Sequence, residues 1–154
     1  KEGRRKAINI LRKHRLWETF LVNKLNFNWG EVHEIAEQLE HIRSPKLIDR
    51  LDSYLSHPKF DPHGEPIPTK SGKISRRNTI SLNELQENAS GKILGVTLDE
   101  KSFLDYLTQL NISIGTNIKL LKKISFDKSL SIKIDDKKQH ISNDVAKHLL
   151  IKIK

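Results

Sequence analysis

Four of the five prolines in this 154-residue chain fall within one stretch, residues 57–79. Proline fixes φ and donates no backbone N–H, and the Asp61-Pro62-His63-Gly64 segment is typical of turns, so this stretch leaves little room for a regular helix or strand. Apolar residues recur at helical spacing before it, whereas short β-branched runs follow it. We therefore predict an α+β protein with a helical domain over residues 1–56, a linker loop over 57–79 and a small β-barrel over 80–154.

Three amphipathic helices are predicted in the first part. The first helix carries its apolar residues on one side, at Ala7, Ile10, Leu11, Trp17, Leu21 and Leu25. The second begins near Asn28 or Trp29 and ends at Ser44-Pro45, and the third runs from Pro45 to Leu55. Three helices in about 55 residues enclose too small a core for independent stability, which predicts self-association.

The last part is predicted to form a compact SH3-like β-barrel. A short helix or turn is expected between residues 82 and 89, and a small helix between 103 and 110. The predicted strands cover residues 91–98, 117–125, 130–135, 140–142 and 149–154, separated by Asp-, Lys- and Asn-rich turns. Several short strands with one small helix in about 75 residues are typical of such barrels.

Composition excludes several classes of function. The chain contains no cysteine, so disulfides, thiolate zinc sites, iron–sulfur clusters and cysteine nucleophiles are absent, and any bound metal must use imidazole, carboxylate, amide or backbone ligands. No apolar run approaches the roughly 20 residues of a membrane span, and no phosphate loop or nucleophile elbow occurs. We therefore expect a cytoplasmic protein that is not an enzyme. Because the chain lacks methionine, we also expect it to be a piece of a longer protein.

Histidine and glutamate recur at helical spacing on the first two predicted helices. His14 and Glu18 are four residues apart within the apolar side of the first helix, where they either bond each other or a neighbouring backbone group, or bind a metal ion. The second helix aligns His33, Glu37, Glu40 and His41 along a ribbon about 100° wide, which is either a solvated face or a set of ligands. Two such helices together predict a site for a divalent metal. A metal-dependent hydrolase would also need an open coordination position and a substrate cleft, for which no residues are evident.

The remaining histidines and the basic residues are less specific. His57 and His63 are predicted to be solvated loop residues, and His140 and His148 have no acidic cluster nearby in the sequence. The net charge of +9 is concentrated in residues 1–16, where seven Lys and Arg residues face Glu2 alone. This basic helix could contact phosphates or form a soluble outer face.

Residues 12–21 (RKHRLWETFL), 32–42 (VHEIAEQLEHI) and 61–68 (DPHGEPIP) resemble the diphtheria-toxin-repressor/manganese-transport-regulator family of metal-dependent transcriptional repressors. Residues 80–154, with GKI at 91–93, FLDYL at 103–107, IGT at 114–116 and ISNDVA at 141–146, resemble the SH3-like FeoA domain that many members carry. The resemblance implies a helical dimerisation and metal-binding domain followed by that barrel. It also implies that a winged-helix DNA-binding domain precedes the chain, so operator DNA would be bound through that missing domain and by no residue of this fragment.

The resemblance also implies a ligand set. His14, Glu18 and His33 match the ancillary metal site of the family, which is completed from the barrel side by Asp99 or Glu100. Glu37, Glu40 and His41 match the primary, regulatory site, whose other ligands belong to the missing domain. Glu37 replaces the cysteine of iron-responsive members, which favours Mn²⁺ and leaves Fe²⁺ open. The alternative is a metal-free helical dimer whose SH3-like module binds a protein or peptide.

Overall fold

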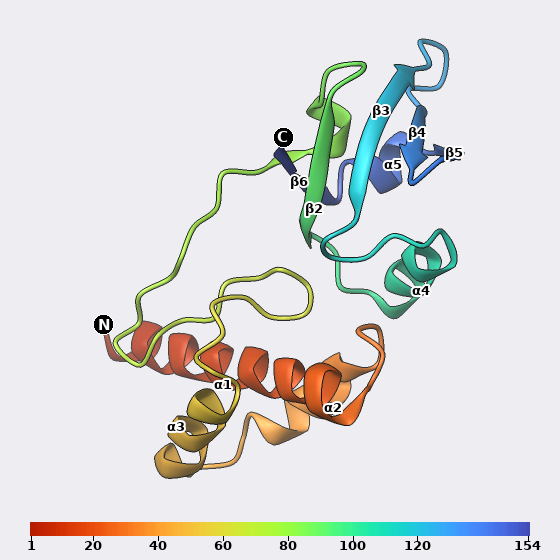
Figure 1. Ribbon diagram of the computed structural model, residues 1–154. Coiled ribbons are helices and arrows are strands. Elements are labelled where there is room, and N and C mark those ends of the chain that lie inside the picture. Colours follow the sequence, from red (N-terminus) through yellow and green to blue (C-terminus); the bar gives the residue numbers. More distant parts are fainter. The chain divides into compact units, whose positions relative to one another are not determined.

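The computed structural model describes residues 1–154 and divides into two compact units (Figure 1). The first unit comprises Lys1–Arg76 together with Asp99–Leu104, and the second comprises Arg77–Leu98 together with Asp105–Lys154. None of the helices combines the length and the apolar composition that crossing a bilayer requires.

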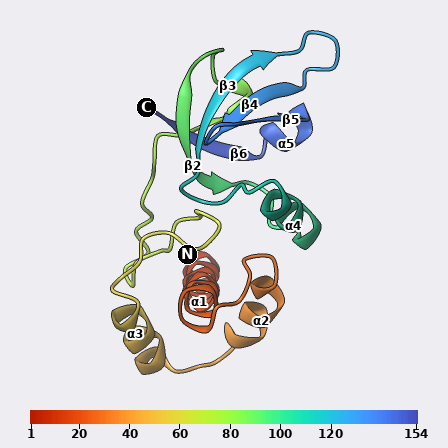
Figure 2. The same ribbon diagram turned by 45° about the vertical axis from the view of Figure 1, so that its right-hand side comes forward.

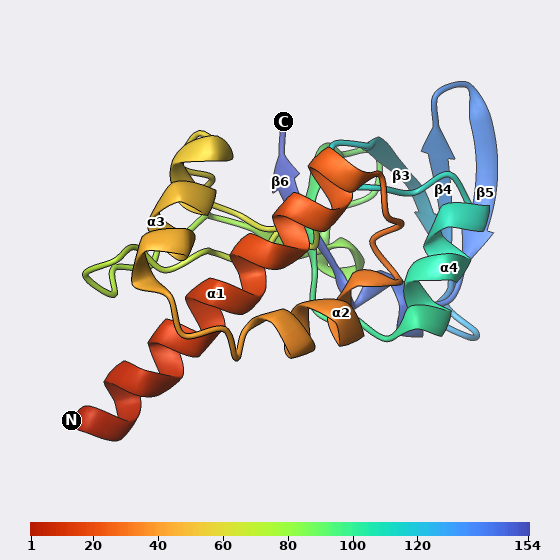
Figure 3. The same ribbon diagram turned by 90° about the horizontal axis from the view of Figure 1, so that it is seen from below.

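The first unit is built on one long helix. Helix α1 (Glu2–Leu25) lies between α2 (Val32–Leu39) and α3 (Pro45–Tyr54), which contact it from opposite sides (Figures 2 and 3). α1 ends at Asn26, whose left-handed backbone (φ 58°) is a common helix terminator. α3 begins at Pro45, and the Ser44 hydroxyl accepts a hydrogen bond from the Leu47 N–H as its N-cap.

α2 is shorter than the predicted helix. The Asn28 side chain accepts from the Gly30 N–H, and the Glu31 side chain accepts from the Asn28 N–H, so residues 28–31 form a turn and the helix begins at Val32. At the other end, Glu40 is the C-cap and keeps helical dihedrals (φ −63°, ψ −17°). Glu40 therefore still continues the direction of the helix, whereas His41 lies beyond it.

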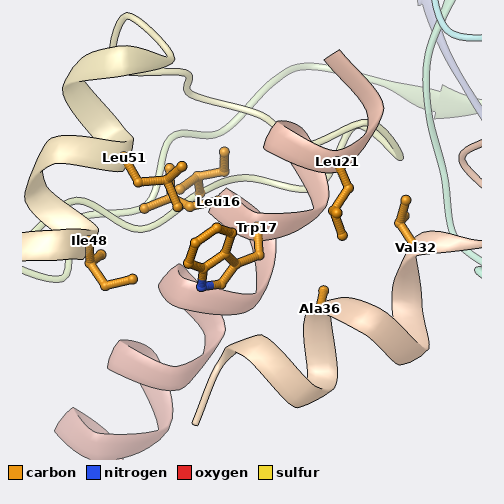
Figure 4. Close-up of a cluster of buried hydrophobic side chains, with 8 residues drawn as sticks. Leu16, Trp17, Leu21, Val32, Ala36, Ile48 and Leu51 are labelled. Carbon is orange, nitrogen blue, oxygen red and sulfur yellow. The ribbon is translucent and has the colours of Figure 1, made fainter. Parts of the chain in front are cut away.

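The apolar core of the first unit includes residues from all three helices. It comprises Leu16, Trp17, Leu21, Val32, Ala36, Ile48, Leu51 and Ile67. Figure 4 shows Leu16 directed toward Leu51 of α3 and Leu21 directed toward Val32 of α2. The predicted apolar side of α1 is therefore wrong in part: Ile10 and Leu25 are 40% and 52% exposed, whereas Leu16, absent from the prediction, is fully buried. Because α2 and α3 pack against two sides of α1, the buried surface of this helix is wider than a single apolar stripe.

Two arginines of the basic helix point into the unit rather than out of it. Arg12 is only 5% exposed and donates to Asp52 of α3 (Nη2–Oδ2 3.0 Å). Arg15 donates to the Pro66 carbonyl and to the Glu65 carboxylate, both in the proline-rich stretch. The Ile67 N–H donates to the Lys59 carbonyl and the Asp61 N–H to the Glu65 carbonyl, so residues 59–67 form a closed loop that Arg15 links to α1.

The second unit is a six-stranded antiparallel sheet in the order β1-β6-β2-β3-β4-β5, which confirms the predicted SH3-like fold. After the linker, the chain forms β1 (Ile80–Ser81), a 3₁₀ turn (Leu82–Glu84), β2 (Ser90–Val96), α4 (Lys101–Gln109), β3 (Asn117–Lys123), β4 (Leu130–Ile134), β5 (Lys137–Ile141), α5 (Asn143–Ala146) and β6 (Leu149–Ile153). Residues 101–104 of α4 belong to the first unit, and the rest of α4 belongs to the second. Alternating residues of β2, β4 and β6, among them Ile93, Ile132 and Ile151, are fully buried and form its core.

Strand β1 was not predicted, and several predicted boundaries in this unit are wrong: β2 ends at Val96 and β3 at Lys123, each two residues earlier than predicted. Two other differences have a local cause. Strand β5 begins at Lys137 instead of residue 140, because Ile134 pairs with Lys137 and the turn consists of Asp135 and Asp136 alone. Asp135 adopts φ 51°, which aspartate tolerates in tight hairpins. The predicted turn after residue 141 is the short helix α5, capped by the Ser142 hydroxyl.

Candidate metal centre

Helices α1 and α2 bring His14, Glu18 and His33 together. His14 and Glu18 are one turn apart on α1, and Nε2 of His14 lies 3.3 Å from Oε1 of Glu18. His33 is in the first turn of α2, with its ring centroid 4.9 Å from that of His14. One ligand atom from each of the three side chains lies within 4.8 Å of the others. This spacing suits three donors around one cation.

Asp99 is the acidic residue near His33. Its Oδ2 lies 3.5 Å from Nδ1 of His33, and the segment Asp99–Leu104 belongs to the first unit. Glu100 is exposed and forms no ion pair with His33. Of the two acids considered from the sequence, only Asp99 contacts the histidine.

Glu37, Glu40 and His41 do not form a comparably compact group. Oε2 of Glu40 lies 2.7 Å from Nδ1 of His14, and Oε1 lies 3.9 Å from Nε2 of the largely exposed His41. Glu37 is exposed but lines the same cavity of about 460 Å³ as His14, Glu18, His33, Glu40 and Asp99. Glu40 therefore connects two sets of residues that the resemblance assigns to separate sites.

His14 is held between two carboxylates, one at each ring nitrogen. Burial alone would lower the pKa of His14, but hydrogen bonds to Glu18 and Glu40 and their negative charges outweigh it and raise the pKa to about 9. In the metal-free chain at neutral pH, both nitrogens therefore carry protons and donate to the acids. A cation near Nε2 would replace that proton, while Nδ1–H would still donate to Glu40.

A second cluster was not foreseen from the sequence. His63, predicted to be solvated, is 1% exposed and stacks on the Trp29 ring (centroids 6.1 Å apart). Its Nε2 lies 2.8 Å from the Trp29 carbonyl, which can only accept, so Nε2 carries the proton in the neutral ring. Its other ring nitrogen, Nδ1, faces Oε2 of Glu18, 3.5 Å away.

Asp61 completes this second cluster. Its Oδ1 accepts from the N–H groups of His63 and Glu65, whereas Oδ2 is buried without a partner, as is Oε2 of Glu18. One ligand atom each of Glu18, Asp61 and His63 lies within 4.8 Å of the other two. Burial and the charge of Glu18 raise the pKa of Asp61 to about 7. Two unpaired carboxylate oxygens beside an imidazole nitrogen fit a bound cation, which would relieve the repulsion between the two carboxylates.

The signal for this cluster was present in the sequence but incomplete. An aspartate two residues before a histidine in an Asp-Pro-His-Gly turn is typical of an Asx turn, in which the aspartate oxygen holds the following backbone. Nothing in the spacing indicated that the turn packs against α1 and directs His63 toward Glu18. That proximity depends on the fold of the loop.

Comparisons with known proteins agree with this fold. The family model described as "Iron dependent repressor, metal binding and dimerisation domain" matches residues 1–69, and the FeoA domain matches residues 80–153. The chain belongs to the diphtheria-toxin-repressor/manganese-transport-regulator family.

Individual relatives cover different shares of the chain. A probable metal transport system membrane protein of Chlamydia trachomatis serovar D is 42% identical over 72 residues, which are 47% of this chain and 16% of that protein. The iron-dependent repressor IdeR of Mycobacterium leprae is 43% identical over 118 residues, 71% of this chain and 51% of that protein. The solved structure of a manganese-dependent transcriptional repressor in complex with manganese is 32% identical with a TM-score of 0.92, covering 100% of this chain and 73% of that one. The chain thus spans about half or less of these two curated relatives.

Proposed function

We propose that this chain is the metal-sensing and dimerising part of a DNA-binding transcriptional regulator of metal homeostasis that responds to Mn²⁺ or Fe²⁺. The observation that carries the proposal is the convergence of His14, Glu18 and His33 beside a buried Glu18 oxygen that has no hydrogen-bond partner. A carboxylate left unpaired in the interior costs free energy that a bound cation would recover.

The proposed ligands fall into three sets. His14 (through Nε2), Glu18, His33 and Asp99 would hold one ion, with Glu40 accepting from Nδ1–H of His14 as an orienting carboxylate. Glu18, Asp61 and His63 would hold a second ion. Glu37, Glu40 and His41 would contribute to the regulatory site, together with ligands from outside residues 1–154.

The donor chemistry supports Mn²⁺ or Fe²⁺. Every proposed ligand is an imidazole or a carboxylate, and the chain offers no thiolate. Carboxylates suit manganese, and imidazole suits iron and the later transition metals. One relative is named iron-dependent and one solved structure is named manganese-dependent, which is consistent with either ion.

The bound ion would supply positive charge that links α1, α2 and the loop at residues 61–63. We propose that the regulator is a cytoplasmic homodimer and that operator DNA is bound by a domain outside residues 1–154. It carries out no chemical reaction in this scheme.

Metal can alter DNA affinity only if it binds the DNA-competent arrangement of the protein more tightly than the other arrangement. DNA affinity of a protein that joins this chain to its DNA-binding domain should therefore increase with Mn²⁺, and equal affinities with and without the ion would contradict the scheme.

Calorimetric titration of Mn²⁺ into the metal-free chain tests the metal site directly. The double variant His14→Ala/His33→Ala should bind at least about tenfold more weakly, because two nitrogen donors are lost. The matched control His57→Ala/His148→Ala removes two imidazoles elsewhere and should bind as the unsubstituted chain does. Circular dichroism confirms that each variant is folded, and Glu18→Gln provides a second test at one atom.

If the first double variant binds Mn²⁺ as tightly as its control, the metal site is rejected. If the unsubstituted chain binds no Mn²⁺ at all, both proposed clusters are rejected, and the alternative is the metal-free dimer with a protein- or peptide-binding SH3-like module. Sedimentation velocity tests the homodimer separately, since a chain that remains monomeric at high concentration would contradict it.

A further inference from the structure

A second cavity lies on a different face of α1 from the metal centre. Its volume is about 750 Å³, and it is lined by α1, by residues 42–49 and by the loop at residues 69–72. Arg5 and Arg12, which line it, are about 160–180° around α1 from His14 at 100° per residue. It shares no lining residue with the metal-site cavity.

The lining of this cavity is strongly cationic. Arg4, Arg5 and Lys13 come from α1, Arg43 from the segment after α2, and Lys70 from the later loop. Asp49 is the single carboxylate among the lining residues, and it is bound by Lys70 (Nζ–Oδ2 2.8 Å) and approached by Arg12 (4.0 Å). Its charge is therefore already compensated.

The other cations have no such compensation. No carboxylate lies within 4 Å of the charged groups of Arg4, Arg5, Lys13 or Arg43. Like charges gathered around a concave surface repel one another and raise the local concentration of anions. Arginine and lysine side chains in such an arrangement are the usual phosphate ligands of proteins.

The cavity also has an apolar wall. Ile8, Ile42, Pro45 and Ile48 line it, and the hydroxyl groups of Thr69 and Ser71 lie at the same loop. Pockets of about 300–1,000 Å³ with apolar walls and a few polar groups are typical of small-molecule sites. The complement of this lining is a molecule that carries several negative charges and also an apolar part.

We propose that this cavity binds a small organic phosphate, with the chemistry of a nucleoside di- or triphosphate: the phosphates contact Arg4, Arg43 and their cationic neighbours, and the base contacts the isoleucine wall. The proposal goes beyond the metal-sensing function and does not depend on it. The two can be tested apart, because a nucleotide can be titrated with all divalent ions removed.

The test is calorimetric titration of ATP into the chain in EDTA. We expect binding that weakens as NaCl is added, and the double variant Arg4→Glu/Arg43→Glu should weaken it by about tenfold or more. The control Arg50→Glu/Lys59→Glu makes the same change of charge at two exposed positions outside the cavity and should alter affinity by less than about twofold. The Mn²⁺ affinity of Arg4→Glu/Arg43→Glu should equal that of the unsubstituted chain, which would show that the metal centre of the variant is intact.

Two further probes identify the part of the molecule that is recognised. Inorganic pyrophosphate tests the phosphates alone and AMP tests the base with one phosphate, and both should bind more weakly than ATP. Equal losses in the cavity variant and its control would overturn the proposal, because the effect would then follow net charge alone. It would also be overturned if ATP did not bind. The same holds if Arg4→Glu/Arg43→Glu weakened the binding of duplex DNA but not that of ATP.

Discussion

At the scale of single residues, the most unusual group is Glu18. Its side chain is 3% exposed, Oε1 faces His14 at 3.3 Å, and Oε2 faces Nδ1 of His63 at 3.5 Å without a hydrogen bond. Glu18 therefore belongs to both clusters of possible ligands. A metal-free chain must fold with this buried charge beside Asp61, so local stability is reduced where binding would occur.

Substitution of Asp61 by asparagine should have opposite effects on the stability of the metal-free chain and on the stabilisation by Mn²⁺. The asparagine side chain would keep the oxygen that accepts from the His63 and Glu65 N–H groups, and it would remove one of the two unpaired carboxylate oxygens of the cluster. We expect Asp61→Asn to raise the unfolding free energy in EDTA by about 1–2 kcal/mol and to reduce the stabilisation gained from Mn²⁺. Urea denaturation with and without Mn²⁺ measures both.

Asp99→Asn is the control for this experiment. Asp99 is a proposed ligand that is nearly half exposed, so its substitution should reduce the Mn²⁺ effect without stabilising the metal-free chain. A fall in the metal-free stability of Asp61→Asn would contradict the interpretation of the cluster as electrostatically strained.

The pKa of His14 gives a second prediction, for the metal-free chain. The folded pKa of about 9 lies above the ordinary value of 6.5, so the contribution of His14 to stability is complete below pH 6.5 and is lost as the pH rises through 9. The pKa of Asp61 is likewise raised, from its ordinary value of 3.8 to about 7. Its contribution to stability is therefore complete below pH 3.8 and is lost as the pH rises from 3.8 through 7. Urea denaturation in EDTA at several pH values should show both losses.

The titration of His14 itself can be followed by NMR. The imidazole signal in EDTA should have its midpoint well above 6.5, and Glu40→Gln should lower that midpoint because one of the two charges is removed. A midpoint at 6.5 that Glu40→Gln does not move would show that the carboxylates leave the imidazole unperturbed.

Residue patterns predicted only part of this chemistry. Helical spacing alone indicated that His14 and Glu18 share a face, and that His33 and Glu37 share another, because helix geometry is local. It could not indicate that Glu40 approaches His14, or that His63 is buried against Trp29, because these contacts depend on how separate segments pack. The roles of all these side chains as ligands stay predictions.

At the scale of elements, one buried arginine, Arg12, adds a polar link to the apolar contact between α1 and α3. Asp52 accepts from Arg12 at 3.0 Å, and its substitution by asparagine would leave a buried guanidinium with a neutral partner. We expect Asp52→Asn to lower the unfolding free energy by about 1–3 kcal/mol. Asp49→Asn, three residues earlier on the same helix, should cost less than about 1 kcal/mol, because Asp49 contacts exposed Lys70 and lies 4.0 Å from Arg12. Equal losses would contradict the assignment of the link to Asp52.

In the sheet of the second unit, Gly91 permits the close approach of β2 and β6. A Cβ atom at this position would lie 2.1 Å from Cγ2 of Ile151 and 2.9 Å from the Lys152 carbonyl. Gly91→Ala should therefore destabilise the sheet by about 1–3 kcal/mol in thermal unfolding. The control Gly3→Ala, where no atom lies within 4 Å, should be neutral or stabilise α1 by up to about 1 kcal/mol, and a harmless Gly91→Ala would contradict the packing.

Element types were easier to predict than their ends and faces. Periodicity indicated the three helices and five of the six strands, since it reflects which side of each is buried, whereas the two-residue strand β1 is too short to show a period. The start of α2 was wrong because side chains of Asn28 and Glu31 stabilise a turn, and the start of β5 was wrong because Asp135 accepts a left-handed backbone. Both are local hydrogen-bond or backbone effects that hydrophobic spacing does not encode.

At the scale of the whole molecule, all proposed ligands within the chain belong to the first unit, including Asp99, which is distant from His33 in sequence. Both tryptophans, Trp17 and Trp29, are in the same unit, and Trp29 stacks on His63. Tryptophan fluorescence therefore reports on the unit that is proposed to bind metal, whereas far-ultraviolet circular dichroism reports on both units.

This difference gives a prediction for metal removal. Because an ion that binds only the folded state stabilises it by RT ln(1 + [metal]/Kd), Mn²⁺ at about 100 times Kd should raise the unfolding free energy seen by fluorescence by about 2.7 kcal/mol, and EDTA should reverse the gain. Zn²⁺ at the same concentration should stabilise at least as much, following the affinity order of divalent ions for nitrogen and oxygen donors, whereas Mg²⁺, which prefers oxygen ligands, should have little effect. Equal stabilisation by Mg²⁺ and Mn²⁺ would mean that the ions act on exposed carboxylates in general. In Glu18→Gln the Mn²⁺ gain should be almost abolished, because this one side chain faces both histidine clusters.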